Sequence, residues 1–194
     1  MSSGLGIFGG AFDPPHNGHV ALVRAAKEAL ALEHVIVLVA ADPGHKRVDA
    51  PASARLAMAR AAFPEDEVVL DDHSRTVDAL RAHPEWADPV FLIGADEFAD
   101  FLSWKEPDEV LRLASLGVAA RPGYPQERLA AVLDALAAPE RVRFFELDEP
   151  VASRTVRARL EQGAGLGDLV PPAVAALIEG EGLYARPPGY TGAA

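Results

Sequence analysis

The sequence contains no cysteine, so disulfides, thiolate metal sites and cysteine nucleophiles are all excluded. It has no apolar run of the roughly 18 residues that a membrane span needs, and no basic segment followed by an apolar stretch at its start. Basic residues are also scarce, because 18 Lys and Arg face 29 Asp and Glu and the formal net charge is -11. Such a surface repels nucleic acid and anionic membranes, so we expect a cytoplasmic protein that binds neither.

Compositional signs of disorder are likewise missing. Gly and Pro, 16 of each in 194 residues, stay below the roughly 25–30% that suggests disorder. A chain of this length buries roughly 70% of the surface that its unfolded form exposes, so it needs no disulfide or structural metal. With no repeat or linker in view, we expect one domain over residues 1–186 and a flexible tail over residues 187–194.

Short apolar runs rich in β-branched residues alternate with alanine-rich stretches of helical pattern. The expected strands are residues 5–8, 34–40, 67–70, 89–93, 116–120 and 142–147, and the first helix is expected over residues 18–32. This alternation predicts an α/β fold in which a single domain is built on a doubly wound, mainly parallel sheet with C-terminal helices. Ligands of such a sheet bind beyond the carboxyl ends of its strands.

Gly4, Gly6 and Gly9 match the G-x-G-x-x-G pattern of dinucleotide-binding loops. In that fingerprint a strand precedes the glycines, whereas here the first two fall before or within the first expected strand. We therefore interpret this match as accidental.

The segment GGAFDPPHNGH, residues 9–19, joins the first strand to the first helix. Gly9 and Gly10 let a ligand approach the backbone closely, and the Asp-Pro-Pro turn stiffens the loop. His16 and His19 are three residues apart, so both imidazoles project on one side of a helical turn, near free amides that favour anions. The pair suits phosphate. The alternatives are a helix cap, a surface histidine or a zinc site, for which no third ligand stands at a recognisable spacing.

This segment resembles the H-x-G-H signature of the nucleotidyltransferase superfamily, although Ala11 stands where Thr is usual. The resemblance implies a Rossmann-like fold and a reaction in which a phosphate or carboxylate attacks the α-phosphate of a nucleoside triphosphate and releases pyrophosphate. It also implies that ATP is bound by residues Gly9, Gly10, Ala11, Phe12, His16, Gly18 and His19.

The segment PVASRTVRARL, residues 150–160, opens a helix with Ser153 available as its cap. Arg154 and Arg157 fall in its first turn, where cations oppose the helix dipole, so a bound anion would compensate them. A solvated basic face is the alternative. The segment partly resembles the second superfamily motif, I-S-S-T-x-I-R, which implies that Ser153 and Arg157 hold the ATP phosphates.

Three further segments resemble those of bacterial nicotinate-nucleotide adenylyltransferases. Gly44-His45-Lys46 is similar to the P-P-H-K element, residues 74–80 are similar to S-Y-T-x-D-T-L, and residues 91–123 are similar to a strand, Gly-Ala-Asp turn, Trp helix and Arg-Pro-Gly exit. The resemblance implies acceptor binding by His45, Lys46, Ser74, Thr76, Trp104 and Arg121, with Gly94 and Asp96 added to the ATP site.

Several of these residues have ordinary alternatives. Trp104 could stack on a nicotinate ring or belong to the core. Asp96 could bind ribose, assist a metal or cap a helix, the hydroxyls near residue 75 could also cap one, and Lys46 could face solvent.

The resemblance implies adenylyl transfer from ATP to nicotinate mononucleotide, with Mg2+ carried mainly on the ATP phosphates and no metal ligands assigned to the chain. The catalytic residues would be His19, His16, Lys46 and Arg157. Nicotinamide mononucleotide or phosphopantetheine as acceptor, and a non-catalytic nucleotide-binding relative, are the alternatives, and a homo-oligomer stays open.

Overall fold

The computed structural model describes residues 4–44, 47–121, 123–148, 153–162 and 164–184. Its strands are β1 (Leu5–Gly10), β2 (His34–Ala40), β3 (Glu67–Asp71), β4 (Val90–Gly94), β5 (Ser115–Ala120) and β6 (Val142–Glu146). Its α-helices are α1 (Asn17–Leu30), α2 (Ala52–Ala62), α3 (Thr76–Ala82), α4 (Ala95–Ala99), α5 (Pro107–Leu113), α6 (Gln126–Ala135), α7 (Ser153–Glu161) and α8 (Pro172–Gly180). Short 3-10 helices, η1 and η2, cover Phe101–Ser103 and Pro139–Arg141.

The strands form one parallel sheet in the order β3-β2-β1-β4-β5-β6. The predicted doubly wound α/β fold is therefore confirmed. The strand order reverses between β1 and β4, where ligands of such sheets bind. The ladder of β1 with β2 runs over six residue pairs, whereas β1 and β4 pair at Gly6↔Val90 and Ile7↔Phe91, near their amino ends. Their carboxyl ends are thus free to separate around a ligand.

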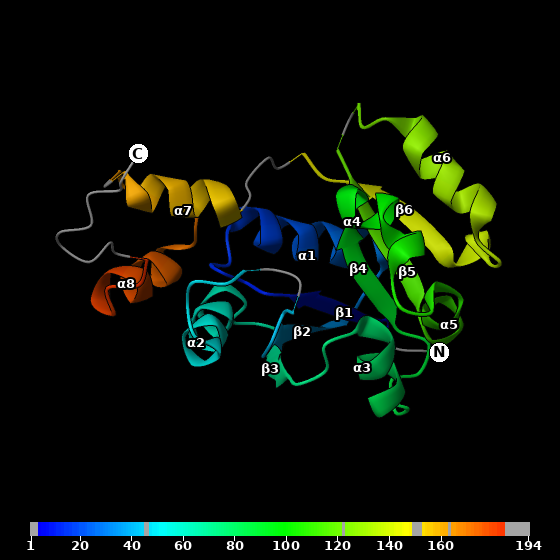
Figure 1. Cartoon of the computed structure of the whole chain (residues 1–194), viewed down its shortest axis with the longest axis horizontal. Coiled ribbons are helices and arrows are strands. Elements are labelled where there is room, and N and C mark those ends of the chain that lie inside the picture. Colours follow the sequence, from blue (N-terminus) through cyan, green and yellow to red (C-terminus); the bar gives the residue numbers. More distant parts are fainter. Residues whose placement is uncertain (1–3, 45–46, 122, 149–152, 163, 185–194) are drawn as a thin grey trace.

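Alternate residues of the strands feed two cores, one on each face of the sheet. Phe8 and Val37 belong to a cluster that includes side chains of α1, α2, α7 and α8. Ile7 and Leu38, their neighbours in sequence, belong to a second cluster with side chains of α3, α4, α5 and α6. In Figure 1 the first set of helices lies to the left of the molecule and the second set to the right. The near-continuous apolar run of β2 is explained by this burial on both faces.

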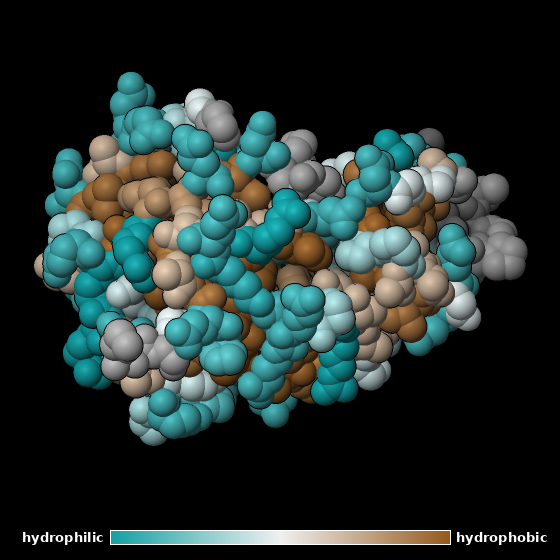
Figure 2. Space-filling model, turned by 180° about the vertical axis from the view of Figure 1, so that it is seen from behind, coloured by the Kyte–Doolittle hydropathy of each residue, from teal (hydrophilic) through white to brown (hydrophobic). Residues whose placement is uncertain are grey.

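The surface carries no single apolar face that the described residues reveal. The large exposed apolar side chains are Leu70 on β3, Leu102 on η1 and Phe144 on β6. Strands β3 and β6 are the two edge strands of the sheet. Figure 2 shows apolar patches separated by polar side chains on the face behind Figure 1. Among the described residues, no helix combines the length and apolar character needed to cross a bilayer. The predicted tail over residues 187–194 lies outside the described residues.

Two element boundaries differ from the sequence expectation. β1 continues through Gly9 and Gly10, so these glycines are strand residues and not part of the loop. Helix α1 ends at Leu30 because Ala31 takes the left-handed conformation (φ 54°) and its N–H donates to the carbonyl of Lys27. The accidental nature of the G-x-G-x-x-G match is supported, since Gly4 precedes β1 and both Gly6 and Gly9 lie within it.

A buried guanidinium joins the loops at the carboxyl ends of β1 and β2. Arg55 of α2 is 1% exposed, and its nitrogens donate at 2.7–3.1 Å to four backbone carbonyls. These acceptors are the carbonyls of Ala11, Ala40, Ala41 and Ala50. Burial lowers the pKa of Arg55, and the negative charge of Asp13 acts against that shift. The guanidinium thus gives these loop carbonyls the hydrogen bonds that a neighbouring strand would otherwise supply.

Replacing Arg55 by Met removes the donors and leaves four carbonyls short of a partner. We expect the free energy of unfolding to fall by about 3–5 kcal/mol, measured by urea denaturation. Arg60→Met, which alters an exposed arginine of the same helix, is the matched control and should stay within about 0.5 kcal/mol of the parent. A loss below about 1 kcal/mol for Arg55→Met would contradict the role given to this side chain.

Candidate active site

The loop after β1 lies at the switch point of the sheet. Its second residue, Phe12, is 2% exposed and adopts a positive φ of 49°. The Phe12 ring packs edge-on against Phe8, with ring centroids 5.4 Å apart, and against His19, with centroids 5.1 Å apart. The rings of Phe8 and Phe12 therefore form an apolar surface against His19 in the first turn of α1.

Two histidines cap helix α1 reciprocally. Nδ1 of His16 accepts the backbone N–H of His19 at 3.3 Å, while Nδ1 of His19 accepts the backbone N–H of His16 at 3.2 Å. This is a capping box built from imidazoles instead of a hydroxyl and a carboxylate. The rings stack with centroids 3.6 Å apart, tilted by 20°. Both the predicted cap and the predicted pairing of these residues are found together.

The cap fixes the proton positions of both rings. A nitrogen that accepts a backbone N–H carries no proton, so each neutral ring holds its proton on Nε2. Burial lowers the pKa of His16 from 6.5 to about 4, which keeps this ring neutral near pH 7. The His16 ring therefore carries an Nε2–H donor and adds no charge near pH 7.

The free amides expected at this helix start are largely taken. The N–H of Asn17 donates to the carbonyl of Leu169 at 2.9 Å, and that of His19 is held within the cap. This corrects the sequence expectation, which could not place residue 169 against α1. Gly18 lies buried in the same turn. Fewer amides than expected are therefore left at this helix start to meet an anion.

Helix α7 is anchored to the same loop. The hydroxyl of Ser153 donates to the carbonyl of Pro14 at 3.0 Å, and Nη1 of Arg157 bonds the carbonyl of Asp13. Ser153 is the first described residue of α7, and its hydroxyl makes this long-range contact. Arg154 is exposed. The structure thereby brings the two sequence motifs together.

Arg157 also faces two carboxylates. Its Nη1 lies 3.6 Å from Oδ2 of Asp13, and its Nε lies 3.1 Å from Oδ2 of Asp49. The Asp13 side chain is 3% exposed and the Asp49 side chain 41% exposed. Carboxylate oxygens therefore occupy positions around this guanidinium that phosphate oxygens favour equally.

The other predicted ATP residues lie along the ends of β1 and β4. Gly9 and Gly10 end β1, and Gly94 occupies the N-cap position of α4. A Cβ at Gly94 would lie 2.9 Å from a carboxylate oxygen of Glu97, so the site is crowded there. Asp96 accepts the hydroxyl of Tyr124 at 3.1 Å and lies 3.8 Å from Nη2 of Arg121. Asp96 sits inside α4, so its capping alternative is wrong.

The predicted acceptor residues that the structure describes follow β3, β4 and β5. Arg75 is the N-cap of α3 and makes no side-chain cap bond, so the capping alternative for Ser74 and Thr76 is wrong. Trp104 packs on Phe101, with centroids 5.3 Å apart, and edge-on on Phe91, 6.2 Å away, and remains partly exposed. Its core alternative is therefore partly realised. His45 and Lys46 lie outside the described residues.

Three residues of this region escaped the sequence analysis as functional candidates: Asp13, Arg55 and Tyr184. Asp13 stands within the quoted loop motif, so its position was visible although its buried partners were not. Nothing in the alanine-rich sequence of α2 marks Arg55 as buried, because its helix has no pronounced apolar stripe. Tyr184 contacts the loop only through the tertiary fold.

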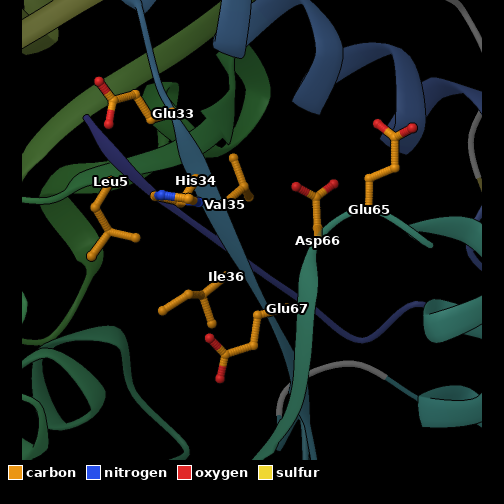
Figure 3. Close-up of a pocket in the computed structure, with 8 residues that line it drawn as sticks. All are labelled: Leu5, Glu33, His34, Val35, Ile36, Glu65, Asp66 and Glu67. Atoms are coloured by element: carbon orange, nitrogen blue, oxygen red, sulfur yellow. The ribbon is translucent and has the colours of Figure 1, made fainter. Parts of the chain in front are cut away.

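A separate cavity of about 290 Å³ opens at the other end of the strands, where β1, β2 and β3 begin. Figure 3 shows its lining side chains, among them the acidic residues Glu33, Glu65, Asp66 and Glu67. Asp66 is paired with Lys27 of α1. This acidic cavity lies away from His16 and His19, and its negative charge does not suit a phosphate ligand.

The chain belongs to the Cytidylyltransferase-like family, whose model matches residues 7–159. Within it, the chain groups with proteins named "Probable nicotinate-nucleotide adenylyltransferase". It is 39% identical to one from Thermus thermophilus, over 93% of this chain and 98% of the relative, and 34% identical to that from Chlorobium luteolum, over 93% and 97%. Its fold is similar to that of Plasmodium falciparum nicotinic acid mononucleotide adenylyltransferase complexed with NaAD, with a TM-score of 0.77, 16% identity and coverage of 94% and 97%.

The lowered pKa of His16 makes stability depend on pH. The unfolded chain takes up this proton near pH 6.5 and the folded chain only near pH 4, so stability from this group is present above pH 6.5 and is lost as pH falls toward 4. Between pH 7 and pH 5 we expect about 2 kcal/mol of loss from this source. His16→Asn, which retains a capping oxygen, should remove it.

The measurement is the free energy of unfolding of both proteins at several pH values. Carboxylates titrate equally in the two, so the difference between parent and His16→Asn isolates the histidine. Parallel curves from pH 7 to pH 5 would show that His16 is not buried as a neutral cap.

Proposed function

We propose that this protein transfers the adenylyl group of ATP to nicotinate mononucleotide, forming nicotinate adenine dinucleotide and pyrophosphate. The observation that carries the proposal is the meeting of paired imidazole donors on α1 with Arg157 of α7 at the switch point of the sheet. Relatives at 34–39% identity over nearly their whole length carry the corresponding name. The fold matches that of a structure described as complexed with NaAD.

The chemistry is an in-line displacement at phosphorus. An oxygen of the acceptor 5′-phosphate forms a bond to the α-phosphorus of ATP, and the bond from that phosphorus to the bridging oxygen of the β-phosphate breaks. The electron pair leaves with pyrophosphate, and the attacking phosphate needs no base because it is already ionised. Catalysis then consists of positioning and of stabilising negative charge.

The residues divide these tasks. His19 and His16 donate from Nε2 to phosphate oxygens at the reacting centre, because the cap uses Nδ1 of each ring as an acceptor. Arg157 neutralises the triphosphate, and Ser153 fixes the helix that carries it. Lys46 would add a second cation. The nucleotide site is lined on the β1 side by Gly9, Gly10, Ala11 and Phe12. On the β4 side it is lined by Gly94 and Asp96.

Mg2+ fits this site as a partner of the substrate. Among the described residues, no three His, Asp or Glu side chains cluster as ligands for a metal ion. Oxygens of the triphosphate are the ligands that Mg2+ prefers, and when bound there it would neutralise charge on the leaving group. Asp13 is already saturated by protein donors, and we assign no metal ligand to the chain.

For the acceptor, we propose the residues that follow β2, β3, β4 and β5, namely His45, Lys46, Ser74, Thr76, Trp104 and Arg121. Trp104 touches Phe91, whose ring lies 3.2 Å from the place of a Cβ at Gly9. A pyridine ring near Trp104 would therefore lie close to the end of β1. We further propose a cytoplasmic enzyme that binds neither nucleic acid nor membrane, and light scattering would establish whether it forms a homo-oligomer.

Pyrophosphate release tests the proposal directly. With ATP and Mg2+, nicotinate mononucleotide, nicotinamide mononucleotide and phosphopantetheine are offered separately to the purified protein. We expect the highest kcat/KM with nicotinate mononucleotide. A preference for another acceptor would overturn the substrate assignment, and ATP binding without turnover of any of the three would indicate the non-catalytic relative.

His19→Ala should lower kcat by about 100- to 1000-fold, because it removes a preorganised donor to developing charge. His34→Ala, an exposed histidine at the amino end of β2, is the matched control and should keep the parent rate. Circular dichroism checks that the capped helix survives. A folded His19→Ala protein with near-parent turnover would remove His19 from the mechanism.

A further inference from the structure

The hydroxyl of Tyr184 reaches back across the chain to the active-site loop. Tyr184 follows α8, and its hydroxyl donates to Oδ1 of Asp13 at 2.7 Å, a contact between residues 171 positions apart. The side chain is half-buried, and burial together with Asp13 raises the pKa of Tyr184. The hydroxyl therefore stays protonated and acts as a donor near neutral pH.

The carboxylate that it meets is held from every side. The backbone N–H of Asp49 donates to Oδ2 of Asp13 at 2.7 Å, and that of Ala50 donates to Oδ1 at 3.0 Å. Arg157 approaches the same Oδ2 and bonds the Asp13 carbonyl. With 3% of Asp13 exposed, no water replaces a lost donor easily.

Of the two carboxylates around Arg157, only one is fixed. Asp49 has 41% of its side chain exposed, and its other charged neighbour, Arg47, is 3.8 Å away with 93% exposed. Exposed pairs of this kind orient a side chain weakly. Asp13, bound by two amides and the Tyr184 hydroxyl, is therefore the group that sets the position of Arg157.

We propose that Tyr184 is a positioning residue for the phosphate-binding arginine: by orienting the Asp13 carboxylate, it holds Arg157 where the ATP phosphates are received. This rests on the proposed function, in which Arg157 binds the triphosphate. Tyr184 itself touches no reacting atom. Its effect on ATP must consequently pass through Arg157.

A double-mutant cycle tests that dependence. Tyr184→Phe keeps the ring and deletes the donor, and it is made both in the parent and in Arg157→Ala. The dissociation constant for ATP with Mg2+ is measured by calorimetry without acceptor, and kcat/KM for ATP is measured where turnover allows. Thermal unfolding is recorded for each protein so that all comparisons are made on folded material.

We expect Tyr184→Phe to weaken ATP binding about fivefold or more in the parent and less than about twofold in Arg157→Ala. Tyr124→Phe is the matched control, because it deletes a tyrosine hydroxyl that donates to another carboxylate, Asp96. Whatever its size, the Tyr124→Phe effect should be equal in both backgrounds.

An equal loss on Tyr184→Phe in both backgrounds, or no loss in the parent, would overturn the proposal. The binding readout separates this result from a failure of the proposed function. If the parent binds ATP but turns over no acceptor, the enzyme assignment fails while the coupling of Tyr184 to Arg157 is still measured.

Discussion

Two buried charges of opposite sign hold the loop that carries the histidines. The Arg55 guanidinium donates to the carbonyls of Ala11 and Ala50, and the Asp13 carboxylate accepts the N–H of the same Ala50. Arg55 and Asp13 thus bind the carbonyl and the N–H of the same residue, Ala50, and tie it to the segment after β1. Each charge is hydrogen-bonded to backbone groups, which offsets the free-energy cost of removing it from water. This framework positions the loop that leads into the first turn of α1.

Much of the fold could be predicted from the sequence because local patterns and burial agree. The run at 34–40 is apolar on both sides, and β2 is in fact covered by both cores. Gly9 and Gly10 were expected in the loop that approaches a ligand, yet pairing with β2 places them in β1 although glycine has a low strand propensity. Ladder formation depends on a neighbour far along the chain, since Gly9 pairs with Leu38, and local propensity cannot report such a partner.

The site divides in the same way. The H-x-G-H spacing places both imidazoles on one helical turn, so their pairing could be anticipated. Which nitrogen of each ring accepts a backbone N–H could not be anticipated, because it follows from the reciprocal cap. Ser153 was expected to cap its own helix, but its hydroxyl bonds Pro14, a partner 139 positions away. Arg55 and Tyr184 take their roles from contacts over 5–44 and 171 positions, which leave no periodic trace in the sequence.

The contact of Tyr184 with Asp13 also bears on how the protein is made. Synthesis is vectorial, and local units fold first as the chain emerges. The β1 loop and α1 leave the ribosome before α7 and α8, which complete their surroundings. A nascent chain that stops short of α7 presents the histidines without Arg157 or the tyrosine behind it. The surroundings of the histidines are thus completed only after α7 and α8 have been synthesised.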